Sequence, residues 1–192
     1  MMGLKLPQNY PDLKTLSKEG VQLLIFDLDG TLLDSMSVWN DVDIEFLGRY
    51  GYEVTPEYTD MVKRATIEDA ARYTQEKYRI PLTWQEIVET WESMVYEFYR
   101  SEVKLKKGAL EYLKEAKKLG FFLSVTTALS KKNANASLSA TGIIDLFDCV
   151  ITLEDLGGNI NKSSPDIFLR ASSYISATKS VITPDKALVF DD

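Results

Sequence analysis

Two aspartates near the start of the chain have the spacing and the sequence context of residues that do chemistry. The apolar run of residues 21–26 ends at Asp27, and Asp29 follows in the turn sequence Asp-Gly-Thr. A short apolar run that stops at a turn signal predicts a buried strand. Carboxylates at the end of such a strand are costly to desolvate unless a positive group binds them, and a hard divalent cation such as Mg²⁺ binds carboxylate oxygens. Asp-x-Asp-Gly is also a common turn composition, so these residues alone leave a purely structural role open.

Three further apolar segments, each predicted to be a strand, are also followed by polar side chains. These are Thr126 and Thr127 at the end of residues 121–126, Lys162 in the loop after residues 148–152, and Asp191 with Asp192 after residues 187–190. Strands that alternate with helices predict a parallel sheet, and such sheets bind ligands outside the carboxyl ends of their strands. The predicted edge gathers acids for a cation, with a hydroxyl group and a lysine for phosphate oxygens, which are the groups that phosphoryl transfer needs.

The rest of the pattern predicts the helices that position these residues. Helical periodicity is found in three segments between the later strands, residues 109–119, 130–141 and 165–175. It also dominates residues 37–104, where Thr83 and Glu86 form a capping box at the start of the clearest helix. We therefore expect an α/β fold: a Rossmann-like parallel sheet core built from residues 1–36 and 105–192, with an inserted all-helical cap of residues 37–104.

The composition excludes several classes of function. The 22 Lys and Arg residues against 29 Asp and Glu residues give a net charge of −7, which argues against nucleic acid or an anionic membrane as the main partner. The chain has no histidine, so it can form neither a Ser-His-Asp nor a Cys-His arrangement, nor a zinc site with histidine ligands. Its single cysteine, Cys149, excludes an internal disulfide and predicts a cytoplasmic location. No apolar run approaches the roughly 18–20 residues that span a bilayer.

The string Asp-Leu-Asp-Gly-Thr-Leu-Leu-Asp-Ser, residues 27–35, resembles the first motif of the haloacid dehalogenase-like superfamily of phosphoryl-transfer enzymes. The polar residues at the later strand ends are similar, in order, to the other three motifs of this superfamily. The resemblance thus covers nearly the whole chain from residue 21. Haloacid dehalogenases and phosphonoacetaldehyde hydrolases lack an aspartate at the position of Asp29, so the resemblance favours the phosphate-processing members.

The resemblance implies a role for each catalytic and phosphate-binding residue. Asp27 matches the nucleophile that attacks phosphorus and forms an aspartyl-phosphate. Asp29 matches the general acid and base, which protonates the leaving oxygen and then activates water. Thr127 matches the hydroxyl residue of the second motif, with Thr126 as the alternative if the register differs by one, and Lys162 matches the lysine of the third motif.

The resemblance also implies a Mg²⁺ site. Its ligands would be the carboxylates of Asp27, Asp191 and Asp192 and the main-chain carbonyl of Asp29. A carboxylate is a poor nucleophile toward a phosphate dianion until the charge is neutralised, and the metal and the lysine of the third motif would neutralise it.

The helical insertion resembles the cap of the β-phosphoglucomutase-like branch, which contains both phosphatases and mutases. The mutases carry a histidine and an arginine in the cap where this chain has Trp39 and Ile67. We therefore expect a phosphatase for a small phosphorylated metabolite, and a sugar phosphomutase is the less favoured alternative. Met36, Trp39 and Asn40 follow the first motif closely, and either contact the leaving group or pack the cap.

The sequence departs from the pattern of this superfamily at the end of the chain. Relatives continue past the fourth motif, whereas here nothing follows Asp192. We expect a fragment of a longer protein, in preference to a naturally shortened one. The second hypothesis for function is a catalytically weak or inactive member that binds only phosphorylated ligands or a protein partner.

Overall fold

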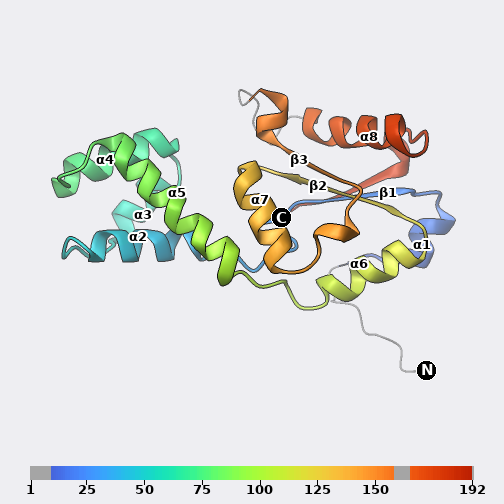
Figure 1. The fold of residues 1–192 in the computed structure, drawn as a ribbon, viewed down its shortest axis with the longest axis horizontal. Coiled ribbons are helices and arrows are strands. Elements are labelled where there is room, and N and C mark those ends of the chain that lie inside the picture. The colour runs from blue at the N-terminus through green and yellow to red at the C-terminus, as the bar shows by residue number, and fades with distance from the viewer. Residues whose placement is uncertain (1–9, 158–164, 192) are drawn as a thin grey trace. The chain divides into compact units, whose positions relative to one another are not determined.

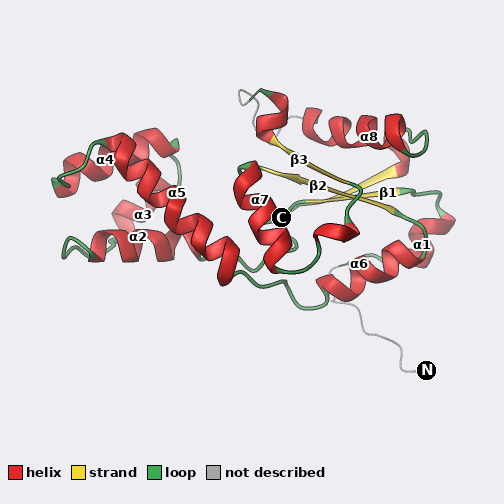
Figure 2. Ribbon diagram, viewed as in Figure 1, coloured by secondary structure: helices red, strands yellow, loops and turns green. Residues whose placement is uncertain are grey.

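The computed structural model describes residues 10–157 and 165–191, and the chain divides into two compact units (Figure 1). One unit comprises Met1–Ser35 and Val103–Asp192, and the other comprises Met36–Glu102. Figure 2 shows that the strands belong to the first unit, the sheet unit, whereas every regular element described in the second, the helical unit, is a helix.

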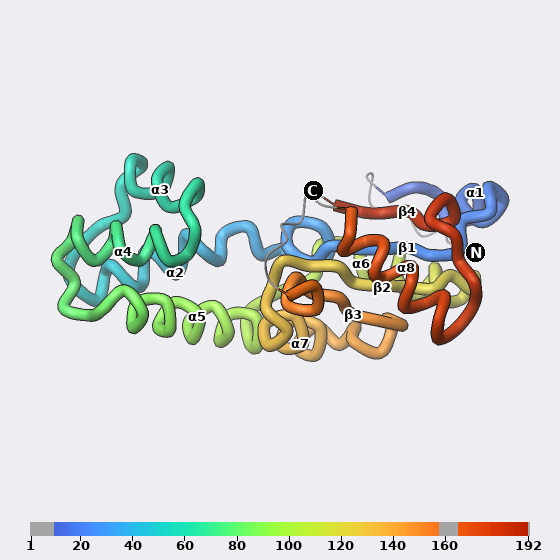
Figure 3. Tube along the Cα trace, turned by 90° about the horizontal axis from the view of Figure 1, so that it is seen from above, coloured from blue at the N-terminus to red at the C-terminus, as the bar shows by residue number. Residues whose placement is uncertain are grey.

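The described strands form a parallel sheet at the centre of the sheet unit. They are β1 (Leu23–Phe26), β2 (Phe122–Thr127), β3 (Cys149–Thr152) and β4 (Ala187–Phe190). Their order is β3-β2-β1-β4, so that β1 lies between β2 and β4 (Figure 3). Phe26, the last residue of β1, pairs with Val125 on one side and with Phe190 on the other. The predicted α/β fold with a parallel sheet is confirmed, and β1 carries its loop to the middle of the carboxyl edge.

Helices cover both faces of this sheet (Figure 1). On one face α8 (Asp166–Thr178) packs against β1, β2 and β3, and its Ile167 and Ile175 join a buried cluster with Leu23 and Ile25 of β1. On the other face lie α6 (Ala109–Lys118), which packs against β2, and α7 (Lys131–Ala140). Because the sheet is covered on both faces, all four residues of β1 are buried, which explains its continuous apolar run.

An aromatic cluster on the α6 face ties the first described residues to the sheet. Phe26 stacks on Phe190 with ring centroids 4.5 Å apart, and Tyr10 stacks on Tyr112 of α6 at 4.6 Å. Tyr112 also meets Phe190 edge-on at 5.9 Å. Four rings from four segments of the chain thus hold the segment before α1 (Leu13–Lys18) against the edge strand β4.

The helical unit has four described helices, α2 (Val38–Gly48), α3 (Pro56–Val62), α4 (Ile67–Tyr78) and α5 (Trp84–Ser101). The predicted capping box of α5 is confirmed, because Glu86 N–H donates to Thr83 Oγ1 at 3.3 Å and Thr83 N–H donates to Glu86 Oε2 at 2.7 Å. The periodicity of the sequence does not predict α3, since this helix is short and buries only Tyr58.

Candidate active site

The carboxyl end of β1 places one of the predicted acids in the interior of the sheet unit. Asp27 follows β1 directly and is 4% exposed, and its N–H donates to the main-chain carbonyl of Phe190 at 2.9 Å. Asp191 follows β4 directly. Since Phe26 and Phe190 are partners in the parallel ladder, Asp27 and Asp191 leave adjacent strands at the same level. The structure thus brings two of the predicted metal ligands to neighbouring positions at one edge of the sheet.

A tight loop after β1 positions the second acid. The carbonyl of Leu28 accepts hydrogen bonds from the N–H groups of Leu32 and Leu33 at 2.9 and 2.8 Å, and Gly30 N–H donates to the carbonyl of Leu33 at 3.1 Å. Gly30 has a φ of 75°, in the left-handed region that glycine adopts without strain. The glycine of the first motif therefore serves the turn that holds Asp29 beside the end of β1.

Ser35 is a candidate site residue that the sequence analysis does not single out. Its Oγ–H donates to Asp29 Oδ1 at 2.5 Å, and the serine is 2% exposed. The loop brings the two side chains together, whereas neither helical nor strand spacing would pair residues 29 and 35. In the sequence, the one feature that points to Ser35 is its place as the last residue of the first motif. This hydrogen bond fixes the orientation of the Asp29 carboxyl group.

Both threonines at the end of β2 are buried, but their hydroxyl groups have different partners. Thr127 Oγ1 accepts a hydrogen bond from Leu129 N–H at 3.2 Å, whereas Thr126 Oγ1 has no hydrogen-bond partner among the described residues. Val125 is the last partner of β1 in the ladder, so Asp27 lies level with Thr126 and Thr127 lies one step further along β2. Both threonines therefore lie at the end of β2 beside Asp27, their side chains on opposite faces of the sheet, and the choice of Thr127 stays a prediction.

Two of the predicted site residues, Lys162 and Asp192, lie outside residues 10–157 and 165–191, which the structure describes. Within these ranges, no three side chains of aspartate, glutamate, histidine or cysteine are grouped so that they could hold a metal ion. The predicted Mg²⁺ site does not need three such side chains from these ranges. It uses two carboxylates from them, those of Asp27 and Asp191, together with the main-chain carbonyl of Asp29. These donors are all oxygen atoms, and the two carboxylates leave adjacent strands, so they fit a hard cation such as Mg²⁺.

A cavity of about 510 Å³ beside the first motif adds basic residues that the sequence analysis does not single out. Its lining includes Tyr10, Gly30, Thr31, Lys106, Lys107 and Asp191. Tyr10 Oη–H donates to the main-chain carbonyl of Thr31 at 3.0 Å, and Lys106 N–H donates to the carbonyl of Leu32 at 2.8 Å. The two lysines therefore bring positive charge to the edge of the sheet that carries the predicted acids.

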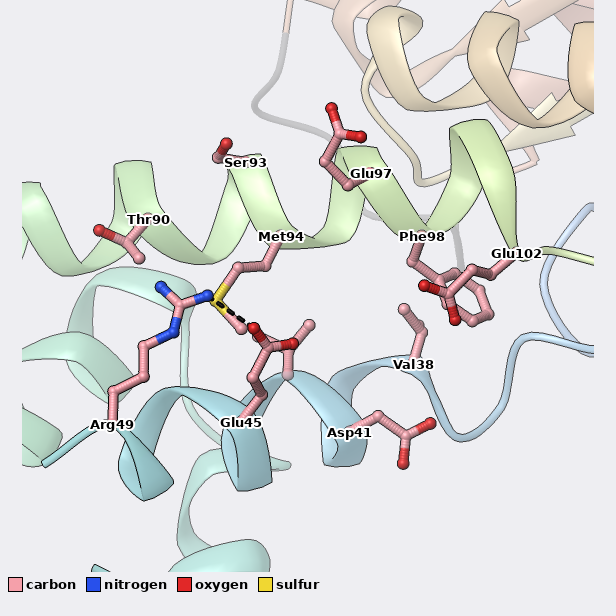
Figure 4. Close-up of a pocket in the computed structure, with 11 residues that line it drawn as sticks. Val38, Asp41, Glu45, Arg49, Thr90, Ser93, Met94, Glu97, Phe98 and Glu102 are labelled. Atoms are coloured by element: carbon pink, nitrogen blue, oxygen red, sulfur yellow. Dashed lines mark hydrogen bonds and ion pairs between the residues drawn. The ribbon is translucent and has the colours of Figure 1, made fainter. Parts of the chain in front are cut away.

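A groove in the helical unit contains none of the predicted catalytic residues. It has a volume of about 530 Å³ and lies between α2 and α5 (Figure 4). Asp41, Glu45, Glu97 and Glu102 line it, and Arg49 pairs with Glu45 at 2.7 Å. An acidic lining of this kind repels phosphate, so this groove is not a candidate for phosphate binding.

The chain belongs to the family of haloacid dehalogenase-like hydrolases, whose pattern matches residues 24–185. It is 29% identical to the pyrophosphatase PpaX of Anoxybacillus flavithermus over 137 residues, and the matched region covers 71% of this chain and 61% of the relative. It is 26% identical to a Drosophila melanogaster protein provisionally named pseudouridine-5′-phosphatase over 171 residues, and that region covers 88% of this chain and 72% of the relative. Among solved structures, a Thermotoga maritima protein provisionally named β-phosphoglucomutase has the same fold, with a TM-score of 0.76, 18% identity and coverage of 88% of this chain and 75% of that chain.

These comparisons confirm the family that the sequence motifs predict. The matched residues 24–185 contain Asp27, Asp29, Thr127 and Lys162. The chain spans 61% of the length of the A. flavithermus pyrophosphatase. In the part of the chain that the structure describes, no helix combines the length and the apolar character needed to cross a membrane.

Proposed function

We propose that the protein is a Mg²⁺-dependent phosphatase that hydrolyses a small phosphomonoester through an aspartyl-phosphate on Asp27. The observation that carries the proposal is the pair of acids after the central strand, where Asp27 is buried beside β4 and Asp29 is held by Ser35. A nucleophile close to an oriented acid suits a hydrolysis in two steps, whereas a protein that only binds phosphate needs neither group. Membership of a hydrolase family, and relatives named as a pyrophosphatase and a phosphatase, also support it.

The proposed reaction uses both acids twice. In the first step a carboxylate oxygen of Asp27 attacks phosphorus, and the bond from phosphorus to the leaving oxygen breaks as Asp29 gives that oxygen a proton. In the second step Asp29 takes a proton from a water molecule whose oxygen attacks phosphorus. The bond from phosphorus to Asp27 then breaks, which releases inorganic phosphate and restores both acids. Ser35 keeps the Asp29 carboxyl group oriented throughout.

The remaining residues are proposed to neutralise and hold the phosphate group. Asp27, Asp191 and Asp192, with the main-chain carbonyl of Asp29, would hold Mg²⁺, which when bound lowers the repulsion between the phosphate and the attacking carboxylate. Lys162 would add a second positive charge, which suits phosphate without demanding a bidentate geometry.

The Thr127 hydroxyl group is proposed to orient a phosphate oxygen. Its oxygen accepts a hydrogen bond from Leu129 N–H at 3.2 Å, so the hydroxyl proton points away from Leu129 N–H and can be donated to another acceptor. A phosphate oxygen is an acceptor that such a hydroxyl group can bind. Thr126, buried one residue earlier, is the alternative.

Residues 37–104 are proposed to act as the cap that selects the organic part of the substrate. The chain has no histidine, and Trp39 and Ile67 stand where the resemblance to mutases predicts a histidine and an arginine. Hydrolysis is therefore favoured over phosphate transfer between two positions of a sugar. The substrate class is a small phosphorylated metabolite.

The test is phosphate release from p-nitrophenyl phosphate by the purified protein, with Mg²⁺, with excess chelator, and after Asp27→Asn. We expect chelator to abolish turnover and the substitution to reduce kcat by about a thousandfold or more, because an amide cannot replace the nucleophile. Asp41→Asn, at an exposed acid of α2, is the matched control and should keep full activity.

Two results would overturn the proposal. One is turnover that survives Asp27→Asn at the level of the protein with Asp41→Asn. The other is a folded protein that releases no phosphate from a broad panel of sugar, nucleoside and aryl phosphates in the presence of Mg²⁺.

A further inference from the structure

We infer that Tyr10 is a positioning residue for the Mg²⁺ site, because it ties the loop that carries Asp29 to the strand end that carries Asp191. The main-chain carbonyl of Asp29 and the carboxylate of Asp191 are proposed ligands of the cation, so this inference rests on the proposed function. Tyr10 itself lies outside residues 24–185, which match the pattern of the family. The role is therefore one that the family pattern does not contain.

The hydroxyl group of Tyr10 holds the loop after β1. Tyr10 Oη–H donates to the main-chain carbonyl of Thr31 at 3.0 Å, and Thr31 lies two residues after Asp29. Among the described residues, Tyr10 is the only hydrogen-bond donor to this carbonyl. Burial raises the pKa of Tyr10 above its usual value of 10.0, so the hydroxyl group keeps its proton and remains a donor at neutral pH.

The ring of Tyr10 contacts the strand next to this loop. Its centroid lies 5.9 Å from that of Phe190, the last residue of β4. Asp191 follows Phe190 directly in the chain. One side chain therefore contacts both the loop that presents the Asp29 carbonyl and the strand that leads to Asp191.

The other main-chain hydrogen bonds of this loop run in different directions. Several of them close the loop on itself, and Lys106 N–H, from the segment before α6, donates to the carbonyl of Leu32 at 2.8 Å. Tyr10 adds a link toward β4. The cavity of about 510 Å³ beside the first motif is lined by Tyr10, Thr31 and Asp191, so the tyrosine, the loop and the end of β4 meet at one place.

Tyr10 can hold the loop because its own position is fixed by further contacts. Its ring stacks on that of Tyr112 with centroids 4.6 Å apart, and Tyr112 Oη–H donates to the main-chain carbonyl of Pro11 at 3.1 Å. The helix that follows, α1, buries Leu13 and Leu16. The segment that carries Tyr10 is thus anchored on both sides of the tyrosine's hydrogen bond to the loop.

This arrangement bears on the affinity for the cation. Groups behind a metal site fix the orientation of its ligands, and a site whose ligands are held in place before binding pays less to order them. Here one ligand lies in a loop and another follows β4, an edge strand among the described strands. By limiting the movement of one against the other, Tyr10 favours the binding of Mg²⁺ without contacting it.

The test is a titration of the purified protein with Mg²⁺ alone, followed by the ¹H–¹⁵N amide signals of Gly30 and Asp191. We expect Tyr10→Phe to raise the Kd for Mg²⁺ by about threefold, within the roughly fivefold that the loss of one neutral hydrogen bond allows. Tyr10→Ala removes the ring as well and should raise the Kd by about tenfold. In aryl-phosphate hydrolysis, the Mg²⁺ concentration for half-maximal rate should rise by the same factors, while kcat at saturating Mg²⁺ stays nearly unchanged.

Tyr112→Phe is the matched control. It removes a hydrogen bond of the same kind from the same aromatic cluster, but this bond ends on Pro11 and not on the loop. We expect it to lower Tm about as much as Tyr10→Phe does and to change the Kd for Mg²⁺ far less, because the ring stack on Tyr10 remains. An equal rise of the Kd in both variants would show a general loss of stability and would overturn the inference.

The same titration separates this inference from the proposed function. If the unchanged protein and the Tyr10→Phe protein bind Mg²⁺ with equal affinity, the inference is overturned and the proposed phosphatase stands. If the unchanged, folded protein shows no binding of Mg²⁺, the proposed metal site is wrong, and the inference that rests on it is overturned as well.

Discussion

The hydroxyl group of Ser35 donates a hydrogen bond of 2.5 Å to Oδ1 of Asp29, the proposed general acid and base. The serine itself is buried, so the bond is protected from competition by water. It holds one oxygen of the Asp29 carboxyl group in place and so orients the group. The loop after β1 therefore carries both the acid and the group that orients it.

Ser35→Ala should lower kcat for p-nitrophenyl phosphate by about tenfold and leave KM nearly unchanged. The reason is that Ser35 orients the Asp29 carboxyl group and has no proposed contact with phosphate. Steady-state kinetics at saturating Mg²⁺ measures both constants. Ser35→Thr, which keeps the hydroxyl group, should recover part of kcat. A Ser35→Ala protein with unchanged kcat and a lowered Tm would show that the bond is structural only.

Tyr10→Phe should lower the free energy of unfolding by about 1 kcal/mol, because it removes the hydrogen bond to the Thr31 carbonyl and keeps the ring stacked on Tyr112. Tyr10→Ala should cost about 2 kcal/mol in total, because the stacking is lost as well. Urea unfolding measures both. Tyr174→Phe, at an exposed tyrosine of α8, is the matched control and should change nothing. Equal stability of the Tyr10→Phe and Tyr174→Phe proteins would contradict the anchoring role of the Tyr10 hydroxyl group.

Thr127→Val and Thr126→Val decide between the two hydroxyl groups at the end of β2. Valine keeps the branched shape of threonine and removes only the hydroxyl group. We expect Thr127→Val to reduce kcat/KM by about ten- to a hundredfold, because a ligand of the phosphate group is lost. Thr126→Val should preserve activity, and should not reduce stability, since its buried Oγ1 has no partner among the described residues. The reverse pattern would move the phosphate-binding role to Thr126.

The sequence predicts β1 and β4 because each is an uninterrupted apolar run that stops at an aspartate, so the strand end and the acid are visible together. Burial on both faces explains the run in Leu23–Phe26, whose four residues are buried, whereas the residues of Ala187–Phe190 are partly exposed. The start of the helix Trp84–Ser101 is predicted as well, because Thr83 and Glu86 have the spacing of a capping box.

What the sequence does not predict depends on contacts between distant segments. Tyr10 finds Thr31 and Tyr112 only when the sheet is formed, and a tyrosine near a chain end carries no local signal for such contacts. The cavity lysines Lys106 and Lys107 are equally ordinary in sequence. Asp43 is one acid among several on α2, and only the fold shows that Tyr58 from α3 covers it.

Asp43→Asn should make the stability of the protein less dependent on pH. Burial raises the folded-state pKa of Asp43 from 3.8 to about 6. Between these values the folded protein holds the proton more tightly than the unfolded chain, so the contribution of this group to stability falls as pH rises through this window. Since the side chain keeps part of its contact with solvent, the loss is about 2 kcal/mol. Tyr58, whose hydroxyl group donates to Asp43 Oδ1, is the titratable group in direct contact with it.

Asparagine is neutral at every pH, and its Oδ1 can accept the Tyr58 hydroxyl proton as Asp43 Oδ1 does. The Asp43→Asn protein should therefore equal the unchanged protein near pH 4 and exceed its free energy of unfolding by about 2 kcal/mol near pH 8. Urea unfolding across this range measures the difference. Asp41→Asn removes the same charge from an exposed position of the same helix and should show no such trend. A difference between the Asp43→Asn and unchanged proteins that stays constant from pH 4 to pH 8 would mean that folding does not raise the pKa of Asp43.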